Sequence, residues 1–580
     1  MKSLQKLLLL AFILALAVFL AVSCAGDTTT APDSGATPGV SDSLSSSVAV
    51  SDSTPSSSAP STTEFEEIFD ETVSGKNYAT SLNASKSSLY YYNKLYKQGP
   101  FAGDPYLFYD DGTFYLYGTT RKYVRPGSIV EEFEVYVSKD LVNWEDGGAC
   151  FVPAPGDWCT DRLWAPEVYK IGDKYYMYYT AAKGSSGVLH GSVAVADSPL
   201  GPFTNAVADG VDGSKPVFDF GSNFPTIDGS LFIDDDGKMY YFFVRDQIGD
   251  NTSSGGTNKT VRSTLWGIEM ENPYTIKAGA EPVKLTEVGR SRLAEKGVFT
   301  QRWETQQGMW NEGPFVLKHN GKYYLTYSAN YFGSKYYAVG YATSDSPLGT
   351  YTKPDNLPIM GIDPNEDSNW SYFDGTGHAM FLTIGEDIYV VYHTLMPEKD
   401  GFRHFTIDSV GFREDGTLYI NGPTISSQPL PSAVTGVGNI ADKATVTVEG
   451  LTGEGYLTDG QINASRVYRD LEAKSEGGKT VVTFTFDTPQ AVRGVIVYNS
   501  ADYATSFTAV TNIRIGKHYS FDNVKVQTDS YNKSQQAIYA GSSAILELNK
   551  SVSVYTVTVT IDSDVPISIS EIMILGDIEK

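Results

Sequence analysis

Five segments of the chain repeat one hydrophobic pattern, in which a polar turn with glycine precedes alternating aromatic and β-branched residues. The segments are DDGTFYLYGTT from Asp110, IGDKYYMYYTA from Ile171, DDGKMYYFFVR from Asp235, HNGKYYLTYSA from His319 and IGEDIYVVYHT from Ile384. Such a turn before an apolar run is typical of a β-hairpin that leads into a buried strand. The aligned tyrosines lie 61, 64, 84 and 65 residues apart, which is the size of a propeller blade. The pattern predicts an all-β fold with a five-bladed β-propeller over residues 99–430.

A second regularity lies 9 to 12 residues before each aligned tyrosine. The residues found there are Asp104, Glu167, Asp228, Glu312 and His378. Because blades are arranged radially around one axis, equivalent positions in five consecutive blades converge on one central site. The sequence therefore predicts a cluster of four acids and one histidine.

The last part of the chain has a different pattern. After the linker SSQPLPSAV at residues 426–434, short alternating strands separated by turns predict a β-sandwich over residues 435–580. Within it, GYLTDGQI from Gly455 and SISEIMILG from Ser568 resemble strands of discoidin-like, galactose-binding sandwiches. That resemblance implies an accessory glycan-binding module, although all seven tryptophans precede position 371.

The first residues form a targeting segment. Lys2 and Lys6 precede an apolar run at residues 7–22 and then Cys24. This layout predicts a lipoprotein-type signal peptide over residues 1–24 with a lipid on Cys24, and sixteen apolar residues fit a transmembrane anchor less well. The Ser/Thr-rich residues 25–63 are expected to be a disordered tether, followed by a connecting segment over residues 64–98. We expect an exported, lipid-anchored protein of the cell envelope, facing either the periplasm or the outside.

Composition narrows the class of ligand. The net charge of −25 opposes binding to nucleic acid and to anionic membrane surfaces, which leaves the lipid as the expected membrane contact. With 13% aromatic residues, the chain has faces that suit stacking on neutral sugars, although most tyrosines are expected to fill sheet surfaces. Cys150 and Cys159 favour a disulfide over two buried thiols in an exported protein. No HExxH or CxxC motif indicates a metal site of the protease or thiolate type.

Three of the converging acids suit glycosidic bond cleavage, which needs one carboxylic acid and one carboxylate. Asp104 lies in GDPYLFYDDG, Asp228 in PTIDGSLFIDDDGK and Glu312 in WNEGPFVLKHNGK. An aspartate before proline or glycine alone is more often a turn former, but the shared repeat position favours a site. Glu167 is interpreted as structural or supporting.

Together with LWAPEVYK from Leu163 and GTGHAMF from Gly375, these motifs resemble glycoside hydrolase family 43. The resemblance implies an inverting mechanism in which Asp104 is the general base and Glu312 the general acid. Asp228 would orient Glu312 and tune its pKa. Inversion predicts that the carboxyls of base and acid lie about 6.5–9.5 Å apart.

The same resemblance assigns three further residues. Arg403 in DGFRHFTID would bind the terminal sugar, and Trp164 would form an apolar wall against the sugar ring. His378 would lie at the propeller axis beside a calcium ion or its waters, so a structural calcium is expected while the reaction requires no cofactor. The alternatives are a surface ion pair for Arg403, packing between blades for Trp164 and a core position for His378.

The resulting hypothesis is a hydrolase that removes terminal α-L-arabinofuranosyl or β-D-xylosyl residues from arabinan, arabinoxylan or xylo-oligosaccharides, with arabinofuranose favoured. Its partner is a plant polysaccharide or oligosaccharide. The alternatives are an endo-acting arabinanase and a non-catalytic glycan-binding lipoprotein. A retaining fructosidase-type propeller would need Asn-Asp-Pro and Arg-Asp-Pro motifs, which the sequence lacks in that form.

Overall fold

The computed structural model describes residues 65–578 except 85, 95–99, 101, 120–130, 186, 209–210, 212, 250–259, 289–300, 356–357, 362–372, 396–402, 463–470, 529–538 and 540. The predicted signal peptide, Cys24 and the tether lie outside the described residues. Residues from Phe65 onward group into one unit. No helix in the described part of the chain is long and apolar enough to span a membrane.

The repeated turns form the hairpins that the sequence predicts. In the first, β3 (Gly103–Asp110) and β4 (Thr113–Thr119) are joined by Asp111 and Gly112, both with positive φ. Two residues with positive φ match the right-handed twist of the flanking strands, which explains the Asp-Gly pair. Asn320 and Gly321 make the same turn in the fourth repeat.

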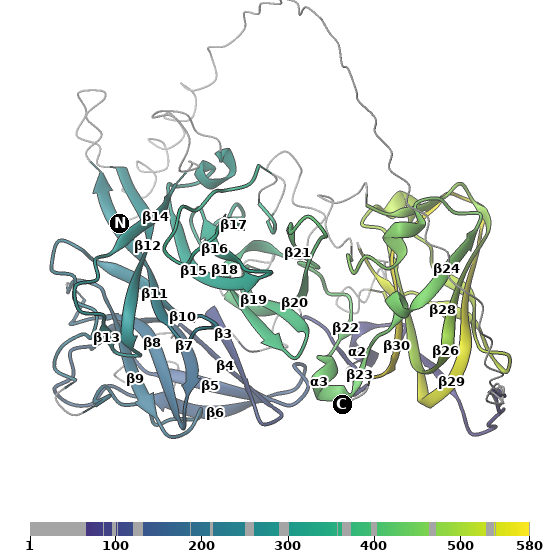
Figure 1. Ribbon diagram of the computed structural model, residues 1–580, viewed down its shortest axis with the longest axis horizontal. Coiled ribbons are helices and arrows are strands. Elements are labelled where there is room, and N and C mark those ends of the chain that lie inside the picture. Colours follow the sequence, from purple (N-terminus) through teal and green to yellow (C-terminus); the bar gives the residue numbers. More distant parts are fainter. Residues whose placement is uncertain are drawn as a thin grey trace, which may run out of the picture. The chain divides into compact units, whose positions relative to one another are not determined.

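Five antiparallel sheets follow one another along the chain, and each starts with the strand before its hairpin (Figure 1). The first contains β3, β4, β5 (Phe133–Ser138) and β6 (Trp144–Phe151), and the second β7 (Asp161–Ile171), β8 (Lys174–Ala182) and β9 (His190–Ala196). The third contains β10 (Thr226–Ile233), β11 (Met239–Gly249), β12 (Thr260–Asn272), β13 (Thr275–Ile276) and β14 (Val283–Glu287). The fourth contains β15 (Asn311–His319), β16 (Lys322–Ala329) and β17 (Ala338–Ser344), preceded by the short helix η1 (Arg302–Thr305). The fifth contains β18 (Asp374–Ile384), β19 (Asp387–Leu395), β20 (Arg403–Phe412) and β21 (Leu418–Ile420).

The first strands of the five sheets close into a ring. β3 contacts β7, β7 contacts β10, β10 contacts β15, β15 contacts β18, and β18 returns to β3. Radial repetition of this kind leaves each blade packed between two neighbours. The predicted five-bladed β-propeller is confirmed.

Each inner strand contains a β-bulge at the same place. The bulged residue lies four positions before the partner of the repeat tyrosine and has a positive φ in every blade. These residues are Asp104, Ala165, Asp228, Gly313 and His378. The five residues expected at equivalent positions are therefore only partly equivalent. Glu312 lies one residue before its bulge and Glu167 two residues after its own, because counting back from the tyrosine ignores the extra residue.

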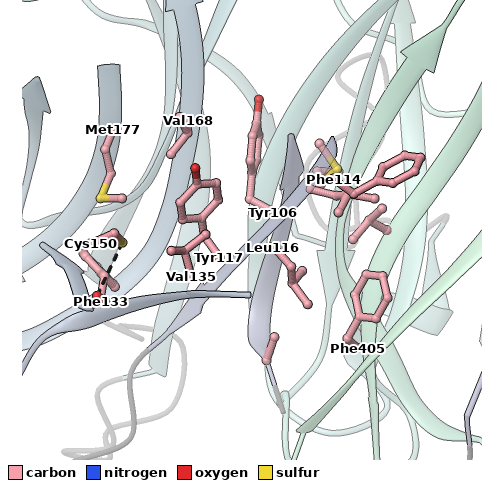
Figure 2. Packing of buried hydrophobic residues seen from close by; sticks show 14 of the residues in the cluster. Tyr106, Phe114, Leu116, Tyr117, Phe133, Val135, Cys150, Val168, Met177 and Phe405 are labelled. Atoms are coloured by element: carbon pink, nitrogen blue, oxygen red, sulfur yellow. Dashed lines mark hydrogen bonds between the residues drawn. The ribbon is translucent and has the colours of Figure 1, made fainter. Parts of the chain in front are cut away.

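Strands near the axis are buried on both faces because adjacent blades pack face to face. Phe114 and Leu116 on one face of β4 and Tyr117 on the other are all buried. Figure 2 shows this packing, with Tyr117 beside Val135.

The same core corrects the prediction of a disulfide. Cys150 and Cys159 are both free and buried. The Cys150 thiol lies 3.4 Å from the carbonyl oxygen of Phe133, to which it donates (Figure 2), and the Cys159 sulfur accepts from Asn205 at 3.3 Å. Burial raises the pKa of both thiols, which keeps them protonated and unreactive.

The C-terminal region is a nine-stranded antiparallel arrangement with its own core. Its strands are β23 (Val437–Asn439), β24 (Ala444–Glu449), β25 (Ala473–Ser475), β26 (Gly478–Asn499), β27 (Ala509–Ile515), β28 (Tyr519–Lys525), β29 (Ser543–Ser563) and β30 (Ile567–Asp577), with β1 (Gly75–Asn77) from the other end of the chain. The long β26 contributes to both layers, since residues 481–486 pair with β24 and residues 492–499 with β30. The two halves face each other across one apolar cluster, as a β-sandwich requires.

The residues expected to form only a connector also belong to this architecture. β1 pairs with β29, and the buried Tyr78 donates to Glu547 at 3.0 Å. The short helix α2 (Ser81–Ala84) follows, and β2 (Tyr90–Tyr91) pairs with β22 (Gln428–Pro429) before the helix α3 (Ser432–Thr435). The polypeptide thus enters through the sandwich before it forms the propeller.

Candidate active site

The β-bulges direct carboxyl groups to the inner end of the blades. Asp104 and Asp228 occupy bulged positions with φ of 49° and 55°. An extra residue in one strand bends the chain and changes the direction of a side chain, and aspartate tolerates positive φ better than most residues. The bulge therefore explains why an aspartate before proline or glycine lies here without forming a turn.

Asp104 is surrounded by positive charge and hydrogen-bond donors. Its Oδ1 accepts from Arg403 Nη1 at 2.5 Å and lies 3.2 Å from His378 Nδ1, while Thr119 donates to Oδ2. Burial alone would raise the pKa of this carboxyl. The Arg403 guanidinium, followed by His378, His393 and the Thr119 hydroxyl, instead holds the pKa of Asp104 well below its usual value.

Glu312 has the opposite environment. The side chain begins β15, and the Tyr337 hydroxyl donates to Oε1 at 2.6 Å while the Trp310 indole donates to Oε2. Burial raises the pKa of Glu312 to about 7, the Tyr337 hydrogen bond partly offsets this, and the charge of Asp104 adds to the increase. Near neutral pH this carboxyl is thus poised to hold a proton.

Asp228 connects the two blades that carry the acids. Its backbone N–H donates to Thr180 Oγ1 at 2.9 Å, and its Oδ2 accepts from the N–H of Gly313 at 3.0 Å. Burial and then the charges of Glu312 and Asp104 raise its pKa well above the usual value. Because Gly313 directly follows Glu312, this contact fixes the backbone beside the Glu312 carboxyl.

Glu167 lies apart from these partners. Its Oε2 accepts from the Tyr169 hydroxyl, which is also 3.3 Å from Ser230 Oγ. Burial raises the pKa of Glu167 to about 8, and no cation of the described chain pairs with it in the structure. The contacts lie between the second and third blades, and they agree with a supporting role.

The three residues expected to bind sugar or metal occupy different places. Arg403 begins β20, pairs with Asp104 and lies over the ring of Phe332 at 5.0 Å, so it is not a surface ion pair. Trp164 is half-buried on β7 opposite Thr180, one residue before its bulge. His378 occupies the bulge of β18, with its ring directed at Asp104.

The described residues were also compared with the ligand set of calcium, which takes six to eight oxygens. No group of three or more His, Cys, Asp or Glu within the described ranges is arranged to hold a metal ion. Nδ1 of His378 faces the Asp104 carboxylate at 3.2 Å. A calcium ion held directly by several side chains does not fit here, and an ion held near His378 through water stays a prediction.

The structure adds two residues that sequence reasoning missed. His393 on β19 is fully buried, and its Nδ1 accepts from the backbone N–H of Asp104 at 3.2 Å. Tyr337 is equally buried beside Glu312. The available signal was composition, because three of the six histidines of the chain lie between positions 378 and 404.

Comparison with known proteins places this geometry in a family. Residues 99–418 match the family described as Glycosyl hydrolases family 43. An arabinoxylan arabinofuranohydrolase of Paenibacillus polymyxa is 26% identical over 54% of this chain and 49% of its own length, so the chain spans about half of that relative. A xylosidase/arabinosidase 43A of Humicola insolens is 30% identical over 46% of this chain and 77% of its own length. A solved structure, described as a thermostable family-43 glycoside hydrolase, is 32% identical over 58% of this chain and 98% of that one, with a TM-score of 0.46. Because the family match covers more than half of the sequence, the chain belongs to glycosyl hydrolase family 43.

Proposed function

We propose that this chain is an inverting glycoside hydrolase that removes terminal α-L-arabinofuranosyl or β-D-xylosyl residues from plant cell-wall glycans. The observation that carries the proposal is the contrast between Asp104, held ionised by Arg403, and Glu312, poised to hold a proton. One carboxylate and one carboxylic acid are the pair that inversion needs. The names of the two relatives, an arabinofuranohydrolase and a xylosidase/arabinosidase, support a pentose as the released sugar.

In the proposed reaction, Asp104 accepts a proton from water while the water oxygen attacks the anomeric carbon. The bond from that carbon to the leaving oxygen breaks, and Glu312 gives its proton to this oxygen. The products are a pentose of inverted anomeric configuration and a shortened glycan. Asp228 keeps Glu312 in place through the N–H of Gly313.

The test is release of aryl alcohol from aryl α-L-arabinofuranoside, β-D-xyloside and β-D-fructofuranoside by protein lacking residues 1–63. Asp104→Asn should lower pentoside turnover by about 10²- to 10⁴-fold, the range for loss of a general base. Asp197→Asn, which changes an exposed carboxylate, serves as the matched control. Turnover that survives in Asp104→Asn would exclude this residue as the base.

Two alternatives correspond to other outcomes. Cleavage of long arabinan with little aryl pentoside turnover would favour an endo-acting arabinanase. Polysaccharide binding without turnover of any substrate would favour a glycan-binding protein.

We further propose that the protein is exported and anchored by a lipid on Cys24. The support is the run of apolar residues 7–22 directly before that cysteine. Cys24→Ser should move the protein from the membrane fraction to the soluble fraction and abolish incorporation of labelled palmitate. Unchanged fractionation would contradict the anchor.

A further inference from the structure

Two rings connect the carboxyl groups of Asp104 and Glu312. Tyr337 donates its hydroxyl to Glu312 Oε1 at 2.6 Å, and its ring stacks on the imidazole of His393 with centroids 5.4 Å apart and planes 14° apart. On the other side, His393 Nδ1 accepts the backbone N–H of Asp104 at 3.2 Å. The contacts run without a break from one carboxyl residue to the other.

The surrounding backbone is shaped to admit these rings. A Cβ on Gly377 would lie 2.2 Å from Tyr337 Cε1, so the ring lies directly against this backbone. Both side chains are fully buried. The rings therefore have almost no freedom to turn away from the carboxyls.

The hydrogen bonds also define the state of His393. Because Nδ1 accepts from Asp104, the proton of a neutral ring lies on Nε2. Nε2 is buried and has no hydrogen-bond partner among the described residues. A charged ring would leave this N–H⁺ uncompensated, which favours a neutral imidazole that does not compete with Arg403 for Asp104.

We propose that Tyr337 and His393 form a positioning pair for the reaction, in which Tyr337 holds the general acid and His393 holds the backbone of the general base. This inference rests on the proposed function, because it assigns Glu312 and Asp104 their roles. Neither residue touches the reacting atoms. Their effect passes through the carboxyls that they hold.

The first test compares Tyr337→Phe with Tyr327→Phe in the full chain. Tyr327 is a matched control because its buried hydroxyl also donates to a glutamate, Glu304 Oε1 at 2.6 Å, away from the site. Loss of the Tyr337 hydroxyl removes a donor that stabilises the charged form of Glu312. The basic limb of the kcat/KM profile should therefore move up by about 0.5 to 1 pH unit, whereas Tyr327→Phe leaves it in place. An unmoved limb in folded Tyr337→Phe protein would overturn the role of Tyr337.

The second test uses His393→Leu and His393→Asn. Asparagine places an acceptor oxygen close to the position of Nδ1, so it should keep kcat within about tenfold while leucine lowers it about 100-fold. Equal losses in both variants would indicate packing alone and overturn the role of His393.

A third measurement does not depend on turnover. Trp310 donates to Glu312, so the part of the tryptophan fluorescence that Trp310→Phe removes should titrate with Glu312. Its midpoint should rise in Tyr337→Phe. If the wild-type protein cleaves no pentoside, the proposed function fails, while this midpoint still supports the contact when it shifts and refutes it when it does not.

Discussion

Asp104 and Glu312 are both buried carboxyl residues, and their surroundings drive them to opposite protonation states. Arg403 lies 2.5 Å from one Asp104 oxygen, whereas the donors to Glu312 are the neutral groups of Tyr337 and Trp310. A cation compensates burial and a neutral donor does so only in part, so the pKa values move apart. The division of labour between acid and base follows from this asymmetry.

Activity should depend on pH through these two groups. Glu312 acts while protonated, and its pKa is raised to about 7, so kcat/KM should fall as the pH rises through about 7. Asp104 acts while ionised, and its lowered pKa places the acidic limb below the pH at which a free aspartate titrates. A pH profile of aryl pentoside hydrolysis checks both limbs. A basic limb above pH 9 would contradict the environment of Glu312.

Replacing Arg403 should move the acidic limb. Arg403→Met removes the cation while burial of Asp104 remains, so the pKa of Asp104 should rise by at least about 1 unit. The acidic limb of kcat/KM then shifts upward by the same amount. Arg514→Met in the sandwich, where the guanidinium donates to the carbonyl oxygens of Gly516 and Lys517, is the control. Equal acidic limbs in the two variants would show that Arg403 does not control Asp104.

At this scale, sequence reasoning placed Asp104, Asp228, Glu312, Arg403 and His378 in one region, and the structure brings them together. Their motifs precede apolar strands, which is a local signal. Tyr337 and His393 carry no such signal, because a buried tyrosine or histidine in a β-rich chain is usually part of the core.

Among the elements, the inner strand of each blade has the clearest functional design. Its bulge directs one side chain to the axis, and small residues beside it allow close approach of other groups. Gly103 precedes the bulge of β3, and a Cβ there would lie 2.3 Å from Arg403 Cζ. The strand start is therefore matched to the arginine of another blade.

Gly103→Ala should consequently displace Arg403 and lower kcat/KM by about 100-fold, since a shift of about 1 Å in a catalytic group has an effect of that size. Gly455→Ala is the control, because nothing lies within 4 Å of a Cβ at that position. Thermal denaturation should show both variants folded. Full activity of Gly103→Ala would mean that Arg403 tolerates the displacement.

The hairpins were predictable from local chemistry, since Asp-Gly and Asn-Gly pairs with positive φ mark their turns. The bulges were not. An extra residue in one strand does not alter the alternation of apolar side chains enough to be seen, which is why Glu167 and Glu312 were placed level with Asp104.

At the scale of the whole molecule, the chain begins and ends in the sandwich. Glu67 is buried there and accepts from the backbone N–H groups of Lys517 and Tyr555. Phe65 meets the ring of Tyr555 at 5.8 Å. The order of the segments therefore differs from the simple succession of tether, propeller and sandwich that the sequence suggests.

Two truncations test this organisation. Protein that begins at residue 65 should keep the melting temperature of the full chain, whereas protein that begins at residue 99 loses β1 and β2. The melting temperature of the sandwich should then fall by at least about 4 °C, which corresponds to one or more kcal/mol. Differential scanning calorimetry separates the two transitions. Identical curves for the two truncations would show that β1 is dispensable.

The blade count could be predicted because five copies repeat along the chain. The role of β1 could not, because three residues carry too little pattern to identify a partner strand. Ser74 next to it bonds Asn549, which is 475 positions away.

This separation has a consequence for biogenesis. During synthesis β1 emerges first and waits for β29 until almost the whole polypeptide has been made, while the propeller strands between them meet partners within tens of residues. An unpaired strand is a template for aggregation during that interval, and its sequence, Gly-Lys-Asn, is short, polar and charged. The strand that completes the sandwich last is thus also one of the least adhesive strands of the nascent chain.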